Sequence, residues 1–301
     1  MTESRERIAV VAAYAGMCAI WGTTWLGIKV SLRYVPPMTA VGLRFVLAAL
    51  CLYTIAASRG RKPNATLPPF PWKLVLVLAV CFFGLNYVLT YVAETRLDSG
   101  LVAVLFGTLP FFVFAFGHVL VGEKTTRLTW LGACVAFAGV ALISLSGESR
   151  GSLPFALVAI CAAAVSAFGN VYAKRHSHHD PLRTLPAAML IAGVAVGLAG
   201  VATERVVWSS VAAPQSLAAL AYLAILGSGV AFFLNLWVLH RVPAGIVGLS
   251  ALIIPVIAVV VGIAFGGESF TWRELAGSAL VIAGVWIALR QSGFADDLVD
   301  G

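Results

Sequence analysis

Ten long apolar stretches follow one another along the chain, separated by short hydrophilic segments. Each is about 20 residues long, which is the length that a helix needs to cross a hydrocarbon core of about 30 Å. The first stretch is longer than the apolar region of a signal peptide and contains two tryptophans, so we expect it to remain as a span. The pattern predicts membrane-spanning helices over residues 8–31, 36–57, 73–94, 99–121, 129–146, 152–174, 184–203, 217–239, 244–266 and 273–290.

The composition supports a chain that is solvated by lipid. Of its 301 residues, 60% are hydrophobic and 11% are charged, whereas soluble domains have about 25% charged residues. So few polar side chains cannot cover a water-soluble fold. A soluble enzyme, a secreted disulfide scaffold and a disordered chain are therefore excluded.

The net charge of +7 does not indicate a nucleic-acid partner. The Lys and Arg residues lie in the short gaps between apolar stretches, which is the usual distribution beside membrane spans. If the N-terminus is cytoplasmic, thirteen of them fall in inner segments and six in outer segments. The positive-inside rule thus predicts an inner (plasma) membrane protein with both termini in the cytoplasm.

The cysteines give no sign of a metal site or of a disulfide framework. There are five, all inside apolar stretches, and no two have CxxC spacing. We therefore read them as small apolar packing residues and expect neither a metal nor a cofactor.

The two halves of the chain repeat each other at an offset of 145 residues. Each copy holds five spans, and an odd number makes the second copy enter the membrane from the opposite side. We expect an all-α integral membrane protein of ten transmembrane helices in two inverted five-helix repeats, residues 1–147 and residues 148–301 with a short acidic tail. Such repeats are typical of transporters that bind their substrate near the midplane. The offset superimposes Lys29 on Lys174, Pro36 on Pro181, Gly84 on Gly229, Pro110 on Pro255, Gly122-Glu123 on Gly267-Glu268 and Gly139-Val140 on Gly284-Val285.

Short motifs carry a family resemblance. The run Trp21–Trp25, followed by Pro37 and Arg44, resembles the opening motif of the drug/metabolite transporter superfamily in its EamA-type branch. The order and spacing of the glycine, proline and polar residues in 86–140 are similar to the EamA repeat signature, and residues 235–285 repeat this pattern. The resemblance implies a transporter rather than an enzyme, and an inner-membrane exporter of small metabolites such as aromatic, hydrophobic and other amino acids.

Two other functions remain open from the residues alone. A carrier of phosphorylated or sugar-linked metabolites would need deep positive charge, and only Arg44 offers it. A non-transporting scaffold or a membrane enzyme is the other alternative, although an enzyme would need paired ionisable or metal-ligating groups at membrane depth, and we find none. The partners we expect are a small amino-acid-like metabolite and the lipid bilayer.

Polar side chains within the spans are the candidates for binding substrate, because burying them in a membrane is costly. The first span offers an aromatic wall and the sixth, its repeat partner, offers small polar groups. Together they suit a ligand with an apolar body and a polar head. Hydrogen bonding between packed helices, or interfacial anchoring for tryptophan, is the alternative for each. The candidates are Trp21, Thr24, Asn86, Tyr87, Thr90, Tyr91, Ser166, Asn170 and Asn235.

Four further residues are candidates for the site. Pro110 and Pro255 occupy matched positions, where we expect a kinked helix at the binding site. Arg44 lies deep in the second span and would meet an anionic substrate group, or, as we favour here, snorkel or bond backbone carbonyls. The repeat has Met189 in its place. His118 is a candidate proton relay, although a lone histidine is more often a packing residue.

Glycines mark one face of the fifth and tenth spans. Gly132 and Gly139 are seven residues apart, about two helical turns, and Gly277 and Gly284 repeat this spacing. Glycine lets helices approach closely. The two spans are thus expected to form either a packing surface or the interface of a homodimer.

Overall fold

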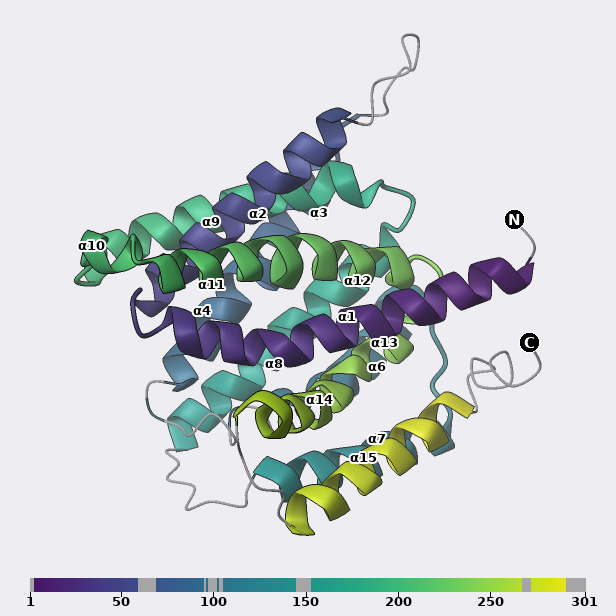
Figure 1. The fold of residues 1–301 in the computed structure, drawn as a ribbon. Coiled ribbons are helices and arrows are strands. Elements are labelled where there is room, and N and C mark those ends of the chain that lie inside the picture. Colours follow the sequence, from purple (N-terminus) through teal and green to yellow (C-terminus); the bar gives the residue numbers. More distant parts are fainter. Residues whose placement is uncertain are drawn as a thin grey trace.

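The computed structural model describes residues 3–58, 69–94, 96, 102, 105–144, 153–266 and 272–290, and every regular element in them is a helix (Figure 1). The helices match the predicted spans to within five residues, except in 99–121, where the described helix begins only at Leu109 and residues 99–101 lie outside the described residues. They are α1 (Glu3–Ser31), α2 (Pro37–Ser58), α3 (Trp72–Val77), η1 (Leu78–Leu85), α4 (Asn86–Glu94), α6 (Leu109–Val121), α7 (Arg127–Ser144), α8 (Leu153–Arg175), α9 (Pro181–Thr203), α10 (Trp208–Val211), α11 (Pro214–Ala224), η2 (Ile225–Val230), α12 (Ala231–Leu239), α13 (Ala244–Gly248), α14 (Ser250–Gly266) and α15 (Trp272–Arg290).

Hydropathy and length identify this as an all-helical membrane protein. Within the described residues, six helices are long and apolar enough to cross a membrane, and four shorter apolar helices accompany them. The six are Arg5–Thr24, Pro37–Ser58, Trp72–Thr90, Leu153–Arg175, Pro181–Thr203 and Pro214–Leu239.

Glycines bring α2 and α9 into backbone contact. A Cβ atom on Gly42 would lie 2.3 Å from the Cα of Gly197, and one on Gly200 would lie 2.6 Å from the backbone N of Thr39. Because later residues of α2 meet earlier residues of α9, the two helices run antiparallel. The carboxylate of Glu204, just after α9, accepts hydrogen bonds from the N–H groups of Met38 (2.8 Å) and Thr39 (2.9 Å). It thereby pairs N–H groups that the first turn of α2 would leave unsatisfied.

The helices α7 and α15 form a second antiparallel pair at one side of the bundle (Figure 1). A Cβ atom on Gly132 would lie 2.5 Å from the carbonyl O of Gly284, and one on Gly139 would lie 2.6 Å from that of Gly277. The glycine face of α7 therefore packs against the glycine face of α15 within one chain. A homodimer through these helices stays a prediction, and it would use their outward faces.

Two π-helical segments interrupt the long helices and were not predicted from the sequence. One is η1, between α3 and α4, and the other is η2, between α11 and α12. A Cβ atom on Gly84 would lie 2.8 Å from the carbonyl O of Ala79, five residues earlier, and one on Gly229 would lie 3.4 Å from that of Ala224. The repeated glycines thus lie where the widened turn brings the backbone close to itself. Such segments are frequent at functional sites.

The prediction that both matched prolines lie inside a kinked helix is wrong for Pro110. Pro255 does lie within α14. Pro110, however, belongs to the first turn of α6, directly after a turn at residues 107–108. Proline is well tolerated there, because the N–H group that it lacks would have no partner within the helix.

Candidate functional site

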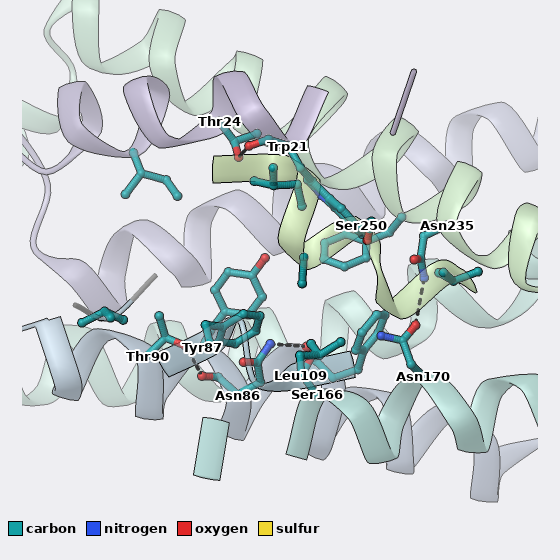
Figure 2. A pocket seen from close by; sticks show the side chains of 18 of the residues that line it. Trp21, Thr24, Asn86, Tyr87, Thr90, Leu109, Ser166, Asn170, Asn235 and Ser250 are labelled. Carbon is teal, nitrogen blue, oxygen red and sulfur yellow. Dashed lines mark hydrogen bonds between the residues drawn. The ribbon is translucent and has the colours of Figure 1, made fainter. Parts of the chain in front are cut away.

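A cavity of about 170 Å³ lies inside the bundle (Figure 2). A cavity of about 150 Å³ binds benzene, so the volume suits one small molecule with a ring or a similar apolar body. Residues from both halves of the chain line it: Trp21, Thr24, Ile28, Arg44, Phe82, Asn86, Tyr87, Thr90, Val102, Phe106, Leu109, Ser166, Asn170, Phe232, Asn235, Val247, Ser250, Ala251, Ile254 and Pro255.

Most of the site residues predicted from the sequence therefore border one cavity. Three predicted residues are not among the lining residues that the structure describes. Leu109 borders the cavity rather than Pro110. His118 is exposed on α6 and is not among the lining residues, so the structure does not bring it to this site. The side chain of Tyr91 lies outside the described residues.

The indole of Trp21 forms the wall of the cavity on α1. Its Nε1 donates a hydrogen bond to the carbonyl O of Gly227 (3.3 Å), and its ring packs edge-on against Phe232 with centroids 5.2 Å apart. The hydroxyl of Thr24 donates to the carbonyl O of Trp21 within the same helix (2.7 Å). Figure 2 shows both residues across the cavity from Asn86 on α4.

Asn86 carries an acceptor without a partner. Its Nδ2 donates to the backbone carbonyl O of Phe82 (3.3 Å). The backbone carbonyl O of Asn86 accepts a hydrogen bond from the hydroxyl of Thr90 (2.9 Å). The side chain is only 7% exposed, and its Oδ1 has no hydrogen bond from any described residue. Leaving a buried acceptor unpaired costs about 1–3 kcal/mol, so this oxygen is available to a ligand.

Asn170 and Asn235 form an amide pair at the other end of the cavity from Thr90 (Figure 2). Nδ2 of Asn235 donates to Oδ1 of Asn170 at 3.2 Å, and both side chains are buried. The bond joins α12 to α8, as the packing interpretation expects. Both residues also line the cavity, as the binding interpretation expects.

Arg44 is buried and does not snorkel. Its Nε donates to the hydroxyl of Ser228 (2.6 Å) and its Nη2 to the carbonyl O of Gly227 (3.0 Å). Its guanidinium carbon lies 5.5 Å from the ring centre of Tyr87 and 5.7 Å from that of Phe45. In the described part of the chain no carboxylate forms an ion pair with it.

The segment η2 thus positions the side chains of two cavity residues. The sequence analysis did not predict this role of η2. The carbonyl O of Gly227 accepts hydrogen bonds from both Trp21 and Arg44. The run Gly227–Gly229 in the middle of an apolar span was the available signal, because Gly-Ser-Gly is unusual inside a helix. Phe82 and Phe232 carried no such signal, since an apolar side chain facing lipid and one facing a cavity give the same pattern.

Polar contacts join several helices at one end of the bundle. Nζ of Lys174 donates to the carbonyl O atoms of Leu239 (2.7 Å) and Val242 (2.8 Å). Oε1 of Glu123 accepts from the N–H of Ala244 at 2.9 Å. These contacts join the ends of α6, α8 and α12 to the start of α13.

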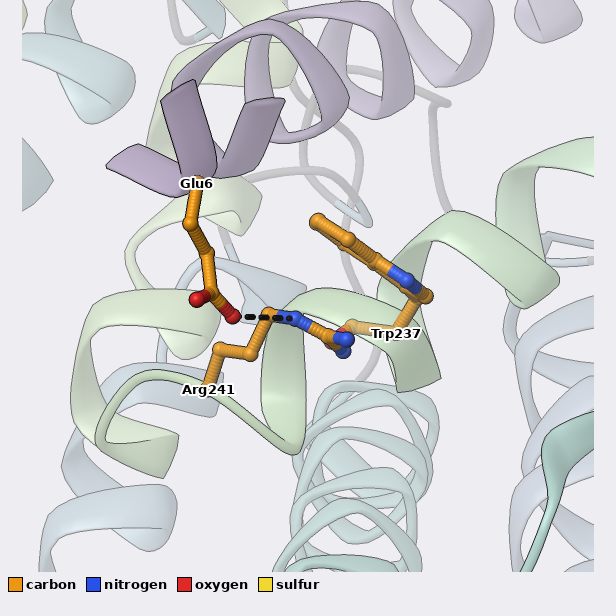
Figure 3. Close-up of polar contacts among 3 residues, drawn as sticks. All are labelled: Glu6, Trp237 and Arg241. Carbon is orange, nitrogen blue, oxygen red and sulfur yellow. Dashed lines mark hydrogen bonds and ion pairs between the residues drawn. The ribbon is translucent and has the colours of Figure 1, made fainter. Parts of the chain in front are cut away.

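A further contact fastens α1 to the same end (Figure 3). Nε of Arg241 lies 3.5 Å from a carboxylate oxygen of Glu6, and its guanidinium lies over the ring of Trp237, 3.7 Å from the centroid. Burial, together with the charges of Lys174 and Arg241, lowers the pKa of His240 to about 4. His240 therefore adds no positive charge to this end at neutral pH.

Comparisons with known proteins agree with this architecture. Residues 8–145 and 153–290 each match a family described as "EamA-like transporter family". The two matches begin 145 residues apart, which is the offset of the internal repeat.

Named relatives and a solved structure cover nearly the whole chain. A protein of Escherichia coli strain K12 named "Uncharacterized inner membrane transporter YedA" is 29% identical, covering 95% of this chain and 92% of its own. One of Salmonella typhimurium, named "Probable amino-acid metabolite efflux pump", is 27% identical, covering 89% and 90%. A crystal structure with 17% identity superposes with a TM-score of 0.83 over 94% of this chain and 97% of the other, so the fold is shared.

Proposed function

We propose that this chain, which belongs to the EamA-like transporter family, exports amino acids and related small metabolites across the inner membrane. Transport is a property of the family, and the relatives that are named for a role are transporters rather than enzymes. Amino-acid cargo and outward direction are supported by the name of the Salmonella relative. The inner membrane is supported by the name of the Escherichia coli relative.

The proposed architecture is ten spans in two inverted five-helix repeats, residues 1–147 and 148–301. Repeat-related helices pack against each other in antiparallel pairs, α2 with α9 and α7 with α15. A two-fold axis in the membrane plane gives repeat-related helices opposite directions, as these two pairs have. Six described helices are long and apolar enough to cross a membrane, and we propose that the four shorter apolar helices belong to the remaining spans.

A cytoplasmic location of both termini is part of the proposal. Glu6, near the start of α1, contacts Arg241 at the end of the bundle where Lys174 and Glu123 form their hydrogen bonds. In Figure 1, the start of α1 and the end of α15 lie at the same end. Lys174 and Arg241, both assigned to inner segments by the positive-inside rule, also lie at that end.

The observation that carries the proposal is the cavity between the two halves. Trp21 and Asn86 come from the first half, and Asn170 and Asn235 from the second. A site at the interface of two repeats changes its access when the halves rock against each other. The contacts of Glu123 and Lys174 join helix ends at one end of the bundle, and we propose that they rearrange when the site opens there. The proposed substrate-binding residues are Trp21, Thr24, Asn86, Tyr87, Thr90, Tyr91, Ser166, Asn170, Asn235 and Pro255.

The replacement of Asn235 by alanine tests this function. In vesicles containing the purified protein, we expect saturable uptake of labelled L-phenylalanine by the wild type. We expect uptake by Asn235→Ala at subsaturating substrate to fall about 10-fold, since a buried hydrogen bond to a polar ligand contributes about 1.5 kcal/mol.

Thr54→Ala is the matched control, because this hydroxyl is exposed on α2 and bonds only its own helix. Its uptake should equal that of the wild type. Absence of saturable flux in the wild type with any of the twenty amino acids would overturn the proposed function.

A further inference from the structure

The cavity has a positive charge that no carboxylate balances within the described residues. Arg44 is 3% exposed, and its hydrogen bonds go to a serine hydroxyl and a backbone carbonyl, neither of which carries a charge. Those two bonds fix the guanidinium plane by Nε and Nη2. Arginine keeps its charge in any protein environment and binds carboxylate in a fixed geometry. A buried cation of this kind calls for an anionic partner, and the cavity is where a partner can reach it.

An unpaired acceptor belongs to a residue that lines the same cavity as this cation. The guanidinium of Arg44 faces the ring of Tyr87, and Asn86 is the preceding residue on α4. Asn86 lines the cavity, and its buried Oδ1 has no donor among the described residues. The two groups together offer a site for a negative group and a site for a hydrogen-bond donor.

This polar pair occurs in one half of the chain only. At the repeat offset of 145 residues, Arg44 corresponds to Met189 and Asn86 to Ala231, both apolar and fully buried. The aromatic rings of Trp21, Phe82 and Phe232 line other parts of the cavity. A cargo with a charged head and an apolar body is therefore held in one orientation, although the halves are related by an internal repeat.

We propose that Arg44 binds the carboxylate of the cargo and that Oδ1 of Asn86 accepts a hydrogen bond from its ammonium group. The substrate class is then the α-amino acid with an apolar or aromatic side chain, whose body packs against Trp21 and Phe232. Monoamines and simple carboxylic acids lack one of the two groups and bind more weakly. This inference rests on the proposed transport function and adds to it the residues that read the head group.

Competition with the wild-type protein provides the first test. Uptake of labelled L-phenylalanine into vesicles is measured against unlabelled L-phenylalanine, phenethylamine, which lacks the carboxylate, and 3-phenylpropionate, which lacks the amine. Charged hydrogen bonds carry enough energy for each analogue to compete about 10- to 100-fold more weakly than L-phenylalanine. If phenethylamine competes as well as L-phenylalanine, the head-group assignment is overturned while the transport function stands.

Variants assign each preference to its residue. Arg44→Met copies the residue of the second repeat and should remove the preference for L-phenylalanine over phenethylamine, whereas Arg44→Lys should retain part of it. Asn86→Ala should remove the preference over 3-phenylpropionate. Size-exclusion profiles check that each variant folds, and the wild-type competition decides the question if one does not. Folded Arg44→Met with the full wild-type preference would overturn the role of Arg44.

Discussion

Replacing Gly42 by alanine is expected to destabilise the protein by at least about 3 kcal/mol, the upper end of the usual cost of overpacking. The added methyl group would lie 2.3 Å from the Cα of Gly197, 2.7 Å from its N and 3.0 Å from the carbonyl O of Gly193. These are backbone atoms, so no side-chain rotation relieves the contact. The helices α2 and α9 must move apart, which loosens the contact between the two halves.

Gly16→Ala is the matched control for this prediction. Gly16 also lies within a long helix, but a Cβ atom there would meet only a side-chain methyl of Leu234, at 3.8 Å. Alanine is a better helix former than glycine by up to about 1 kcal/mol, so this variant should be as stable as the wild type or more so. Thermal unfolding in detergent measures both. Equal melting temperatures for Gly42→Ala and Gly16→Ala would contradict the close packing of α2 and α9.

Replacing Trp21 by alanine is expected to lower the affinity for an aromatic amino acid about 10- to 100-fold. The indole packs against Phe232 with centroids 5.2 Å apart, and its Nε1 bonds the carbonyl O of Gly227. Removing an aromatic wall forfeits about 1.5–3 kcal/mol of apolar burial with the ligand. The loss should be smaller for alanine than for phenylalanine as cargo, because alanine buries less surface there.

The control for Trp21→Ala is Trp72→Ala. Trp72 begins α3 and is 59% exposed, so its removal should change the apparent affinity less than about twofold. Trp21→Phe, which retains an aromatic ring and loses the Nε1 hydrogen bond, should fall between the two. Competition curves with L-phenylalanine measure all three variants. A wild-type affinity in folded Trp21→Ala would show that this wall does not contact the cargo.

Helix positions were predictable because the bilayer imposes a length and an apolar composition on each span. Ten apolar stretches were expected, and the described helices follow nine of them to within five residues, while α6 covers only the later part of the stretch 99–121. The polar candidates were predictable for a related reason. A residue such as Asn86 is expensive inside a membrane, so its presence there is itself a signal, and ten of the nominated side chains do border the cavity.

Other features leave no trace in hydropathy. The π-helical turns η1 and η2 change hydrogen bonding without changing polarity, although the repeated glycines Gly84 and Gly229 lie in them. Phe232 faces the cavity, while other apolar residues face outward. Hydropathy is the same for both positions, because lipid is as apolar as the side chains that face it. The place of Pro110 depended on a turn at residues 107–108 that the apolar pattern of the stretch concealed.

The central claim is that the two halves of the chain enter the membrane with opposite orientations and enclose the cavity between them. Arg127 and Trp272 test it most directly, because they begin α7 and α15, lie 145 residues apart and are both exposed. Each is replaced by cysteine in turn, and sealed vesicles of known orientation are treated with a membrane-impermeant thiol reagent. The wild type is the control, since its five cysteines lie within helices. The account predicts that the two positions are labelled from opposite sides of the membrane, and labelling of both from the same side would contradict it.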